Sequence, residues 1–343
     1  MGSTATLRDV AERAGVSIGT ASQALNHRPS VSPETRARVI EAAQSLGYLF
    51  KDSGMIAVDR SIAVVGMLVK HDFGEPVSVN PYFSHVQAGV ESECRRRGLS
   101  LMFSNIEVDA RNRPMSWPAM VSEQRADGLL LIGTFLEDTV DLIQRQVSKP
   151  IIMVDGYAPS MPIDMVLIDN AQGFSLGVEH LIRLGHRHIG LLGWMEDSPP
   201  GIWERMESYL TTLKAHGISQ SYIECSKLTR ADGYAGVQRL LARAPQVTAV
   251  MVCNDDTAIG ALYGARDLGL DVPRDFSIIG FDDIDLAKEV VPALTTIAVP
   301  KSWLGAMGVR FLLERATYPE QPKLSVRLAT ELLIRDSTCP PRR

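Results

Sequence analysis

Hydrophobic residues recur every three or four positions through the first 48 residues of the chain, a spacing that predicts short amphipathic helices. A leucine, a valine and two alanines fall in this way on one face of residues 7–14. A second helix is expected over residues 18–25, and a third between Ser32 and Gly47. We expect the apolar faces of the three helices to meet in one small core.

Polar residues and glycines mark the ends of these predicted helices. Thr6 is expected to cap the first helix, with Asp9 reaching back to it, and Ser17 to cap the second. Gly15 supplies the permissive backbone of the tight turn between them. Two helices joined by so short a turn predict a helix-turn-helix, whose second helix enters the major groove of DNA. The alternative is a small helical cap without a role in DNA binding.

From residue 62 onward the pattern changes, because short continuous apolar runs alternate with amphipathic stretches. Apolar strands separated by helices predict an α/β fold of parallel sheets covered on both faces. Two such sheets side by side would form a hinged cleft, with ligand at the carboxyl ends of the strands. The strand-like runs are residues 62–69, 99–104, 128–133, 150–155, 188–193, 248–253 and 276–281. The helix-like stretches between them include residues 83–97, 171–184, 205–215, 233–244 and 257–268.

Charge changes this picture little. The formal net charge of −5 argues against a non-specific nucleic-acid coat. Residues 1–60 hold seven Lys or Arg against six Asp or Glu, so the N-terminal helices are only locally basic. This balance suits a pair of these helical units on one DNA site better than a single unit, since each phosphate contact adds modestly to affinity.

The chemistry of the chain gives no sign of an enzyme, and we expect no catalytic residues, metal or cofactor. The sequence contains no dinucleotide-binding glycine motif, P-loop or nucleophile elbow. His186 and His188 lie two residues apart at a helix end, which does not suit a metal site on a helix face, and we expect His186 to pack or form hydrogen bonds. The four widely spaced cysteines are typical of unpaired thiols in a reducing cytoplasm. No apolar run approaches the ~18 residues of a membrane span, and no signal peptide is expected.

The first 48 residues closely resemble the DNA-binding headpiece of the lactose/galactose repressor (LacI/GalR) family. The resemblance rests on TLRDVAERAGVSIGTASQALN at residues 6–26 and VSPETRARVIEAAQSLGY at residues 31–48. It implies a helix-turn-helix headpiece over residues 1–48 that contacts bases or phosphates. The positions that it assigns to DNA contact, with two in the following linker, are Thr6, Leu7, Ser17, Ile18, Gly19, Ser22, Gln23, Asn26, Ser30, Ser32, Thr35, Lys51 and Ala57.

Ile18, Gly19 and Gln23 stand at positions that vary among family members with different operators. Gln23 is the best base reader of the three, because its amide can pair bidentately with adenine. Ile18 can pack on a thymine methyl group, whereas Gly19 has no side chain with which to read a base.

Residues 49–61 are interpreted as a hinge. In the family this segment folds into a helix on the operator and inserts a leucine into the minor groove. Ala57 stands at the leucine's position. We expect this protein to bend its site less than its relatives, because a wedge needs bulk as well as position. The alternative is that Met55 or Ile56 provides the wedge.

The resemblance extends over residues 62–343, which are similar to the periplasmic-binding-protein-like regulatory core of these repressors. It is carried by NPYF at residues 80–83, residues 169–193, CNDDTAIGAL at 253–262, SIIGFDD at 277–283 and PALTTI at 292–297. The family's chain crosses three times between two lobes, which implies crossings near Ile168, Ala298 and Leu324. Lobe 1 is therefore expected at about residues 62–167 and 299–324, and lobe 2 at 168–298 and 325–338.

The resemblance also places effector contacts in the cleft between these lobes. Carboxylates and a guanidinium suit a ring with several hydroxyls, so a sugar or sugar derivative is expected, with a nucleobase as the alternative. Trp203 is a candidate to stack on the apolar face of such a ring. Asp255 is expected to cap a helix and Asp283 to be structural. The full set of expected effector contacts is Asn80, Tyr82, Asp155, Trp203, Arg205, Asn254 and Asp282.

The sequence therefore predicts a cytoplasmic transcriptional repressor whose DNA affinity is controlled by a small molecule. We expect a homodimer on a pseudo-palindromic operator, since the symmetry of the site mirrors that of the protein. The C-terminal residues lack the heptads that would join dimers into tetramers. The alternatives are a solute-binding protein without DNA activity and an α/β enzyme with an appended DNA-binding module.

Overall fold

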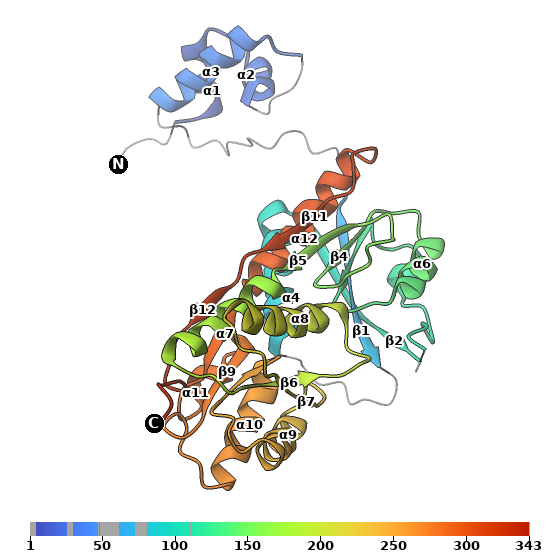
Figure 1. Cartoon of the computed structure of the whole chain (residues 1–343). Coiled ribbons are helices and arrows are strands. Elements are labelled where there is room, and N and C mark those ends of the chain that lie inside the picture. Colours follow the sequence, from blue (N-terminus) through green and yellow to red (C-terminus); the bar gives the residue numbers. More distant parts are fainter. Residues whose placement is uncertain are drawn as a thin grey trace. The chain divides into compact units, whose positions relative to one another are not determined.

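The computed structural model describes residues 5–25, 30–46, 48, 62–72, 81–109 and 111–342. The chain divides into two compact units, residues 1–61 and 62–343, called the headpiece and the core below. Each is described by itself (Figure 1).

Three helices make up the described part of the headpiece: α1 (Leu7–Ala14), α2 (Ile18–Leu25) and α3 (Pro33–Ser45). The expected capping box is present, because the Thr6 hydroxyl accepts from the Asp9 N–H while the Asp9 carboxylate accepts from the Thr6 N–H at 2.7 Å. Gly15 ends α1 with a left-handed backbone (φ 64°). The helices share a core of small apolar side chains, namely Val10, Ala11, Ala14, Ala21, Ala24, Leu25, Val31, Val39, Ala42 and Ala43.

The described residues of the core form two six-stranded sheets of similar strand order. The first runs β11-β5-β4-β3-β1-β2 and is entirely parallel. The second runs β12-β10-β9-β8-β6-β7, and only β12 is antiparallel to its neighbour. The strands of the first sheet are β1 (Val64–Asp72), β2 (Ser100–Val108), β3 (Gly128–Ile132), β4 (Ile151–Val154), β5 (Asp164–Ile168) and β11 (Ser325–Leu328), and those of the second are β6 (Ile189–Trp194), β7 (Tyr222–Cys225), β8 (Ala249–Val252), β9 (Ser277–Asp282), β10 (Thr295–Ala298) and β12 (Glu331–Leu333).

Helices cover both faces of each sheet, which is why the strands read as continuous apolar runs. In β8, Val250 and Val252 pack into the hydrophobic cluster under α9 and α10, while Met251 between them meets Gly177 of α7 on the opposite face. Figure 1 shows this layering around the second sheet. The helices of the core are α4 (Pro81–Arg97), α5 (Ala119–Ser122), α6 (Glu137–Gln146), α7 (Asn170–Leu184), α8 (Pro200–Ala215), α9 (Arg230–Arg243), α10 (Asp255–Asp267), α11 (Leu286–Glu289) and α12 (Lys301–Thr317).

The family's α/β fold class is thus confirmed, with one correction to the division of the lobes. The chain passes between the sheets after β5, after β10 and after β11. The third passage was expected near Leu324, but β11 pairs with β5 in the first sheet, so the passage follows Leu328. It is tied to the first passage, because the Asp169 N–H donates to the Leu328 carbonyl at 2.9 Å.

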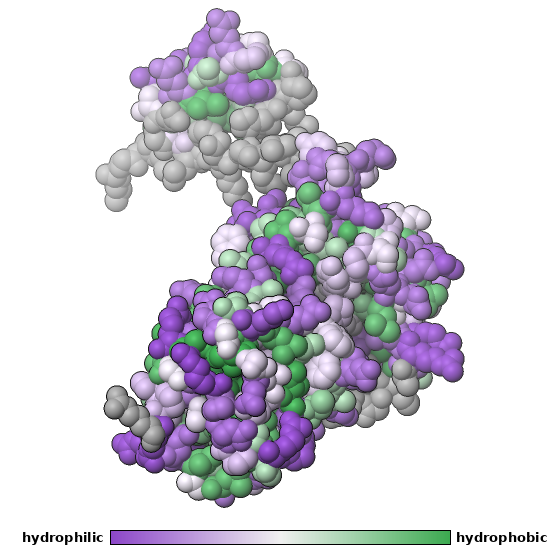
Figure 2. Space-filling model, in the orientation of Figure 1, coloured by the Kyte–Doolittle hydropathy of each residue, from purple (hydrophilic) through white to green (hydrophobic). Residues whose placement is uncertain are grey.

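Two pairs of helices cross with their backbones in close contact. A Cβ on Gly260 of α10 would lie 1.9 Å from the Arg230 carbonyl oxygen of α9. A Cβ on Gly305 of α12 would lie 2.1 Å from the Val86 carbonyl oxygen of α4. Only glycine fits at these crossings as they stand. The face of the molecule in Figure 2 is mainly hydrophilic, with small separated hydrophobic areas.

Candidate functional site

The predicted DNA-reading helix, α2, has one buried and one exposed side. Ala21, Ala24 and Leu25 lie in the headpiece core, while Ile18 is 47% exposed. Gly19 and Gln23 are also exposed, and Ser22 is half-buried beside them. This is the division that the helix-turn-helix prediction requires.

Several hydroxyls of the predicted DNA contacts already bond within the headpiece. Ser17 accepts from the Thr20 N–H at 3.0 Å and so caps α2, and Ser32 accepts from the Thr35 N–H at 3.3 Å. The Ser30 hydroxyl donates to Gln23 Oε1 at 3.3 Å, so the Gln23 amide oxygen also bonds within the headpiece. Thr6 is exposed in its capping box and Leu7 is half-buried. Asn26, Lys51 and Ala57, with Met55 and Ile56, lie outside the described residues.

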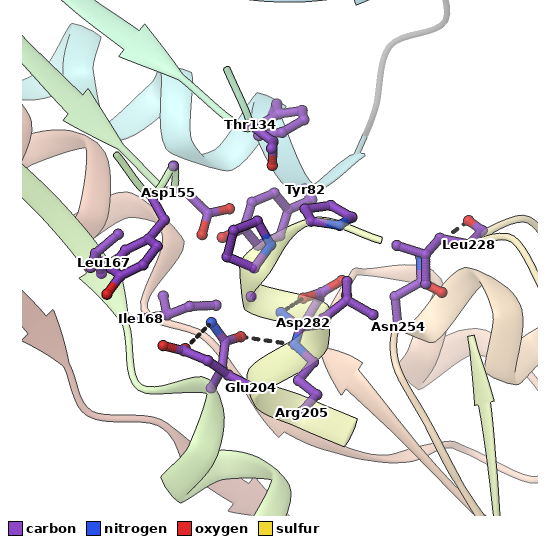
Figure 3. Close-up of a pocket in the computed structure, with 18 of the residues that line it drawn as sticks. Tyr82, Thr134, Asp155, Leu167, Ile168, Glu204, Arg205, Leu228, Asn254 and Asp282 are labelled. Atoms are coloured by element: carbon purple, nitrogen blue, oxygen red, sulfur yellow. Dashed lines mark hydrogen bonds and ion pairs between the residues drawn. The ribbon is translucent and has the colours of Figure 1, made fainter. Parts of the chain in front are cut away.

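The core has a cavity of about 280 Å³ between its two sheets, lined from both lobes. It lies at the carboxyl ends of the strands, where open α/β sheets bind ligands. Tyr82, Thr134 and Asp155 come from the first lobe, and Arg205 and Asp282 face them from the second (Figure 3). Asn254 also lines the cavity.

Arg205 is the best-anchored polar group of the cavity. Its side chain is 8% exposed. Nε donates to the Asn170 Oδ1 at 2.8 Å, Nη1 donates to the Cys253 carbonyl, and the guanidinium lies 3.7 Å from the centre of the Phe281 ring. Sequence analysis expected α8 to begin at Arg205, but the helix begins at Pro200, because proline suits the first helical position. Arg205 therefore projects from the second turn.

Asp282 ends β9 in an unusual conformation. It has φ 110°, and the following Asp283 has φ 53°, so two non-glycine residues in succession have positive φ. The Lys301 ammonium donates to both of their carbonyls. The Asp282 carboxylate lies 3.9 Å from Arg205 Nη2. Burial raises the pKa of Asp282 to about 7, against the opposing effect of Arg205.

Asp255 was expected to cap α10, and this prediction is wrong. The N-cap is Asn254, whose side chain accepts from the Thr257 N–H at 3.0 Å. Asp255 is fully buried and accepts from the Ile284 N–H at 2.9 Å and from the Thr296 hydroxyl at 2.6 Å. It therefore supports the turn that carries Asp282. The structural expectation for Asp283 is consistent with its ion pair to Arg335 at 2.5 Å.

The first-lobe wall of the cavity carries a second buried carboxylate. Asp155 follows β4 with φ 56°, and its N–H donates to the Val166 carbonyl at 2.9 Å. Burial raises the pKa of Asp155 to about 6, although the hydrogen bond from Tyr82 and the charge of Arg205 oppose the shift. Burial also raises the pKa of Tyr82, which keeps its hydroxyl protonated.

The structure brings together five of the seven expected effector contacts. Tyr82, Asp155, Arg205, Asn254 and Asp282 all line the cavity. Asn80 lies outside the described residues. Trp203 is not among the lining residues, although its neighbours Ile202 and Glu204 are, and it packs edge-on against Trp194 with ring centres 5.1 Å apart.

Sequence analysis missed Asn170 and Glu204 in the cavity wall. Asn170 follows a short buried strand, β5, and that position at a strand end was the available signal. The two are hydrogen-bonded to each other at 3.2 Å (Figure 3).

His186 has a structural role, as expected. It is buried, and its ring nitrogens lie 2.8 Å from the Thr248 hydroxyl and 2.9 Å from the Cys339 carbonyl. Among the described residues, no cluster of three or more His, Cys, Asp or Glu is placed to hold a metal ion. None of the helices in the described ranges has the length and apolar character needed to cross a membrane.

Two family profiles match this chain. The profile of bacterial regulatory proteins, lacI family, matches residues 6–49, and that of a periplasmic binding protein-like domain matches residues 178–338. These matches fall on the headpiece and on the core respectively.

Curated relatives match almost the whole chain. The HTH-type transcriptional repressor PurR of Mannheimia succiniciproducens is 31% identical, over 97% of this chain and 98% of the relative. The ribose operon repressor of Haemophilus influenzae is also 31% identical, with the same coverage.

Solved structures agree over a similar extent. The complex of the transcriptional regulator CelR with cellobiose has a TM-score of 0.71 at 27% identity and covers 97% of this chain and 99% of the other. The lac repressor dimer bound to operator and an anti-inducer has a TM-score of 0.68 at 26% identity, covering 98% and 100%.

Proposed function

Because the chain belongs to the LacI family of bacterial regulatory proteins, we propose that it is a repressor whose affinity for its operator is controlled by a sugar bound in the core cavity. The protein is a DNA-binding repressor with an effector-binding core, and it is not an enzyme. Family membership also sets aside a solute receptor without DNA activity. The site of action is the cytoplasm, where bacterial operators lie.

The proposed DNA contact is the exposed side of α2. Gln23 and Ile18 would read base edges, and Ser17, Ser22 and Asn26 would contact bases or phosphates. Leu7, Thr6, Ser30, Ser32, Thr35 and Lys51 would add flanking contacts. Ala57 would give a weak minor-groove wedge, and this part of the proposal concerns residues outside those described. The related lac repressor binds its operator as a dimer, which supports a dimer on a pseudo-palindromic site here.

The operator proposal is tested by selecting binding sites from random DNA with the full-length protein. We expect an inverted repeat to be enriched, and Gln23→Ala to weaken binding by roughly 1–3 kcal/mol with relaxed preference at one base pair per half-site. Lys214→Ala, at an exposed position of α8, is the matched control. Selection of no site, or of sites without an inverted repeat, would refute the proposal.

One observation carries the effector proposal: Asp155, Arg205 and Asp282 converge on one cavity from two lobes. Carboxylates and a guanidinium can each address two adjacent hydroxyls, whereas Tyr82 offers a flat face to a ring. Among the described lining residues, Arg205 is the only cationic side chain, and it is already engaged by Asn170 and Cys253. The cavity therefore favours an uncharged sugar over a sugar phosphate.

A purine is the second candidate, because relatives named as PurR repressors are 31–33% identical to this chain. Tyr82, Phe83 and Tyr157 line the cavity and could stack on a planar base. The buried carboxyls of Asp155 and Asp282 could accept from ring N–H groups.

The test is a thermal-shift panel of uncharged pentoses, hexoses and disaccharides against their phosphates and against free purines. A cleft ligand raises the unfolding temperature by mass action. The four tryptophans all lie in the core, so their fluorescence reports its unfolding. Any hit is then added to an operator gel shift. Stabilisation by phosphates or purines alone would refute the sugar proposal.

A further inference from the structure

The orientation of Arg205 depends on a neighbouring amide. Asn170 lies at the start of α7, directly after the first passage between the lobes, and is buried. Its Oδ1 accepts from Arg205 Nε at 2.8 Å, and its Nδ2 donates to Glu204 Oε2 at 3.2 Å. Rotating the amide by half a turn would set a donor against the guanidinium and an acceptor against the carboxylate. The observed orientation is therefore the only one that satisfies both neighbours.

Glu204 is in turn fixed from the other lobe. Arg327 donates to both Glu204 oxygens, at 2.6 Å from Nη2 and 3.0 Å from Nη1, a bidentate pair. Arg327 lies on β11 of the first sheet, whereas Glu204 lies on α8 of the second lobe. This ion pair therefore spans the lobes, and both side chains are at most 37% exposed.

We propose that Asn170 and Glu204 are positioning residues that orient Arg205 only when the two lobes are closed. When the lobes separate, Glu204 loses Arg327 and its carboxylate is free to turn toward water. Asn170 then loses the acceptor that fixes its amide, and Arg205 loses its fixed partner at Nε. The contacts from Arg327 through Glu204 and Asn170 to Arg205 are called the relay below. The role of the relay in effector recognition rests on the proposed function. Its geometry is tested on the protein alone.

The readout is hydrogen exchange at the Arg205 Nε–H, measured by NMR on full-length protein labelled with [¹⁵N]arginine. The signal is assigned by its absence in Arg205→Lys. Glu204→Leu removes the contacts of Glu204 with Asn170 and with Arg327. We expect it to speed exchange at the Arg205 Nε–H about tenfold. Arg327→Gln, which keeps the Glu204–Asn170 contact, should speed it about threefold. Thermal unfolding checks that each variant is folded.

Asp256→Asn is the matched control. Asp256 also lines the cavity and pairs with Arg230 at 2.6 Å, but both residues lie in the second lobe. Breaking this pair should leave the exchange rate of Arg205 unchanged. Exchange that speeds equally in the control and in Arg327→Gln would overturn the proposal.

A charge swap distinguishes the relay from an ion pair that only holds the two lobes together. The double variant Glu204→Arg with Arg327→Glu restores the ion pair across the lobes but leaves the Asn170 Nδ2 without an acceptor. We expect it to recover the unfolding temperature that each single reversal loses, while exchange at Arg205 remains fast.

Full recovery of slow exchange in the swap would mean that closure alone orients Arg205, and unchanged exchange in Glu204→Leu and Arg327→Gln would remove the relay altogether. Either result overturns the proposal. Neither affects the effector panel or operator selection, so failure of the relay is distinguishable from failure of the proposed function.

Discussion

Asp155, Asp282 and Asp283 have backbones in the left-handed region, and each follows or ends a strand at the cavity. Such conformations cost on the order of 1 kcal/mol or more and persist only where the surroundings enforce them. Here Lys301 donates to the Asp282 and Asp283 carbonyls, and Asp255 accepts from the next N–H. Asp155 and Asp282 line the cavity, whereas the Asp283 carboxylate pairs with Arg335.

Buried Asp282 gives the core a stability that depends on pH. Its pKa is about 7 in the folded protein, above the ordinary value near 4. Between these values the folded chain binds more protons than the unfolded chain, so stability falls as pH rises through this window. We expect Asp282→Asn to gain on the order of 2 kcal/mol relative to wild type between pH 5 and 8. Urea unfolding followed by tryptophan fluorescence measures this, and parallel pH profiles for the two proteins would contradict it.

Arg205→Ala should abolish the response to the effector while operator binding stays near normal, because Arg205 belongs to the core and not to the headpiece. Removing the Arg205 guanidinium, which would donate hydrogen bonds to the ligand, should cost roughly 2–4 kcal/mol of ligand affinity. Calorimetry with the ligand found in the panel, and a gel shift without ligand, measure the two effects. Unchanged ligand affinity would assign Arg205 to internal bonding with Asn170 and Cys253 alone.

Among the elements, the seven long apolar runs were predictable, and five shorter strands were not. All seven expected strands are present within a few residues of their predicted bounds. β7, β11 and β12 were missed because they lie at sheet edges with exposed and half-buried residues, which weakens the apolar signal. β5 and β10 were also missed, although they are largely buried, because they have only five and four residues. α12 was missed because glycines at its crossing with α4 interrupt the helical pattern.

The residues of the site also differ in how far they could be predicted from the sequence. Strand-end carboxylates such as Asp155 and Asp282 were found, because parallel strands bring their carboxyl ends together. Glu204 and Arg327 were not found, because their contact joins residues 123 positions apart on different lobes. Asn170 was not found, because the strand before it, β5, was not predicted. Trp203 was misplaced because helix α8 begins five residues earlier than expected.

The crossing of α9 and α10 gives a prediction at the scale of elements. In Gly260→Ala the new methyl group would meet the Arg230 carbonyl, so the helices must separate, at a cost of about 1–3 kcal/mol. Gly236→Ala, also in this helix pair, meets its nearest atom at 3.4 Å and should be neutral or stabilising by up to about 1 kcal/mol. Urea unfolding of both variants tests the pair. Equal effects would show that helix propensity, not the close crossing, governs these positions.

For the whole molecule, we expect a dimer as the largest stable species. The expectation rests on the proposed two-fold operator, because the related lac repressor binds its operator as a dimer. Light scattering of the full-length protein at micromolar concentration measures this. A tetramer would contradict the prediction.

The three passages between the sheets also constrain how the chain is made. Neither lobe is continuous in sequence: α12 and β11 complete the first lobe, and β12 completes the second, yet all three lie in the last 43 residues. A ribosome therefore releases the headpiece, which has its own core, long before either lobe has all its parts. During synthesis the nascent chain exposes the apolar surfaces that α12 will cover on α4, β3, β4 and β5. We therefore expect the core to fold only after its last codons have been translated, with these apolar surfaces exposed until then, whereas the headpiece can fold earlier.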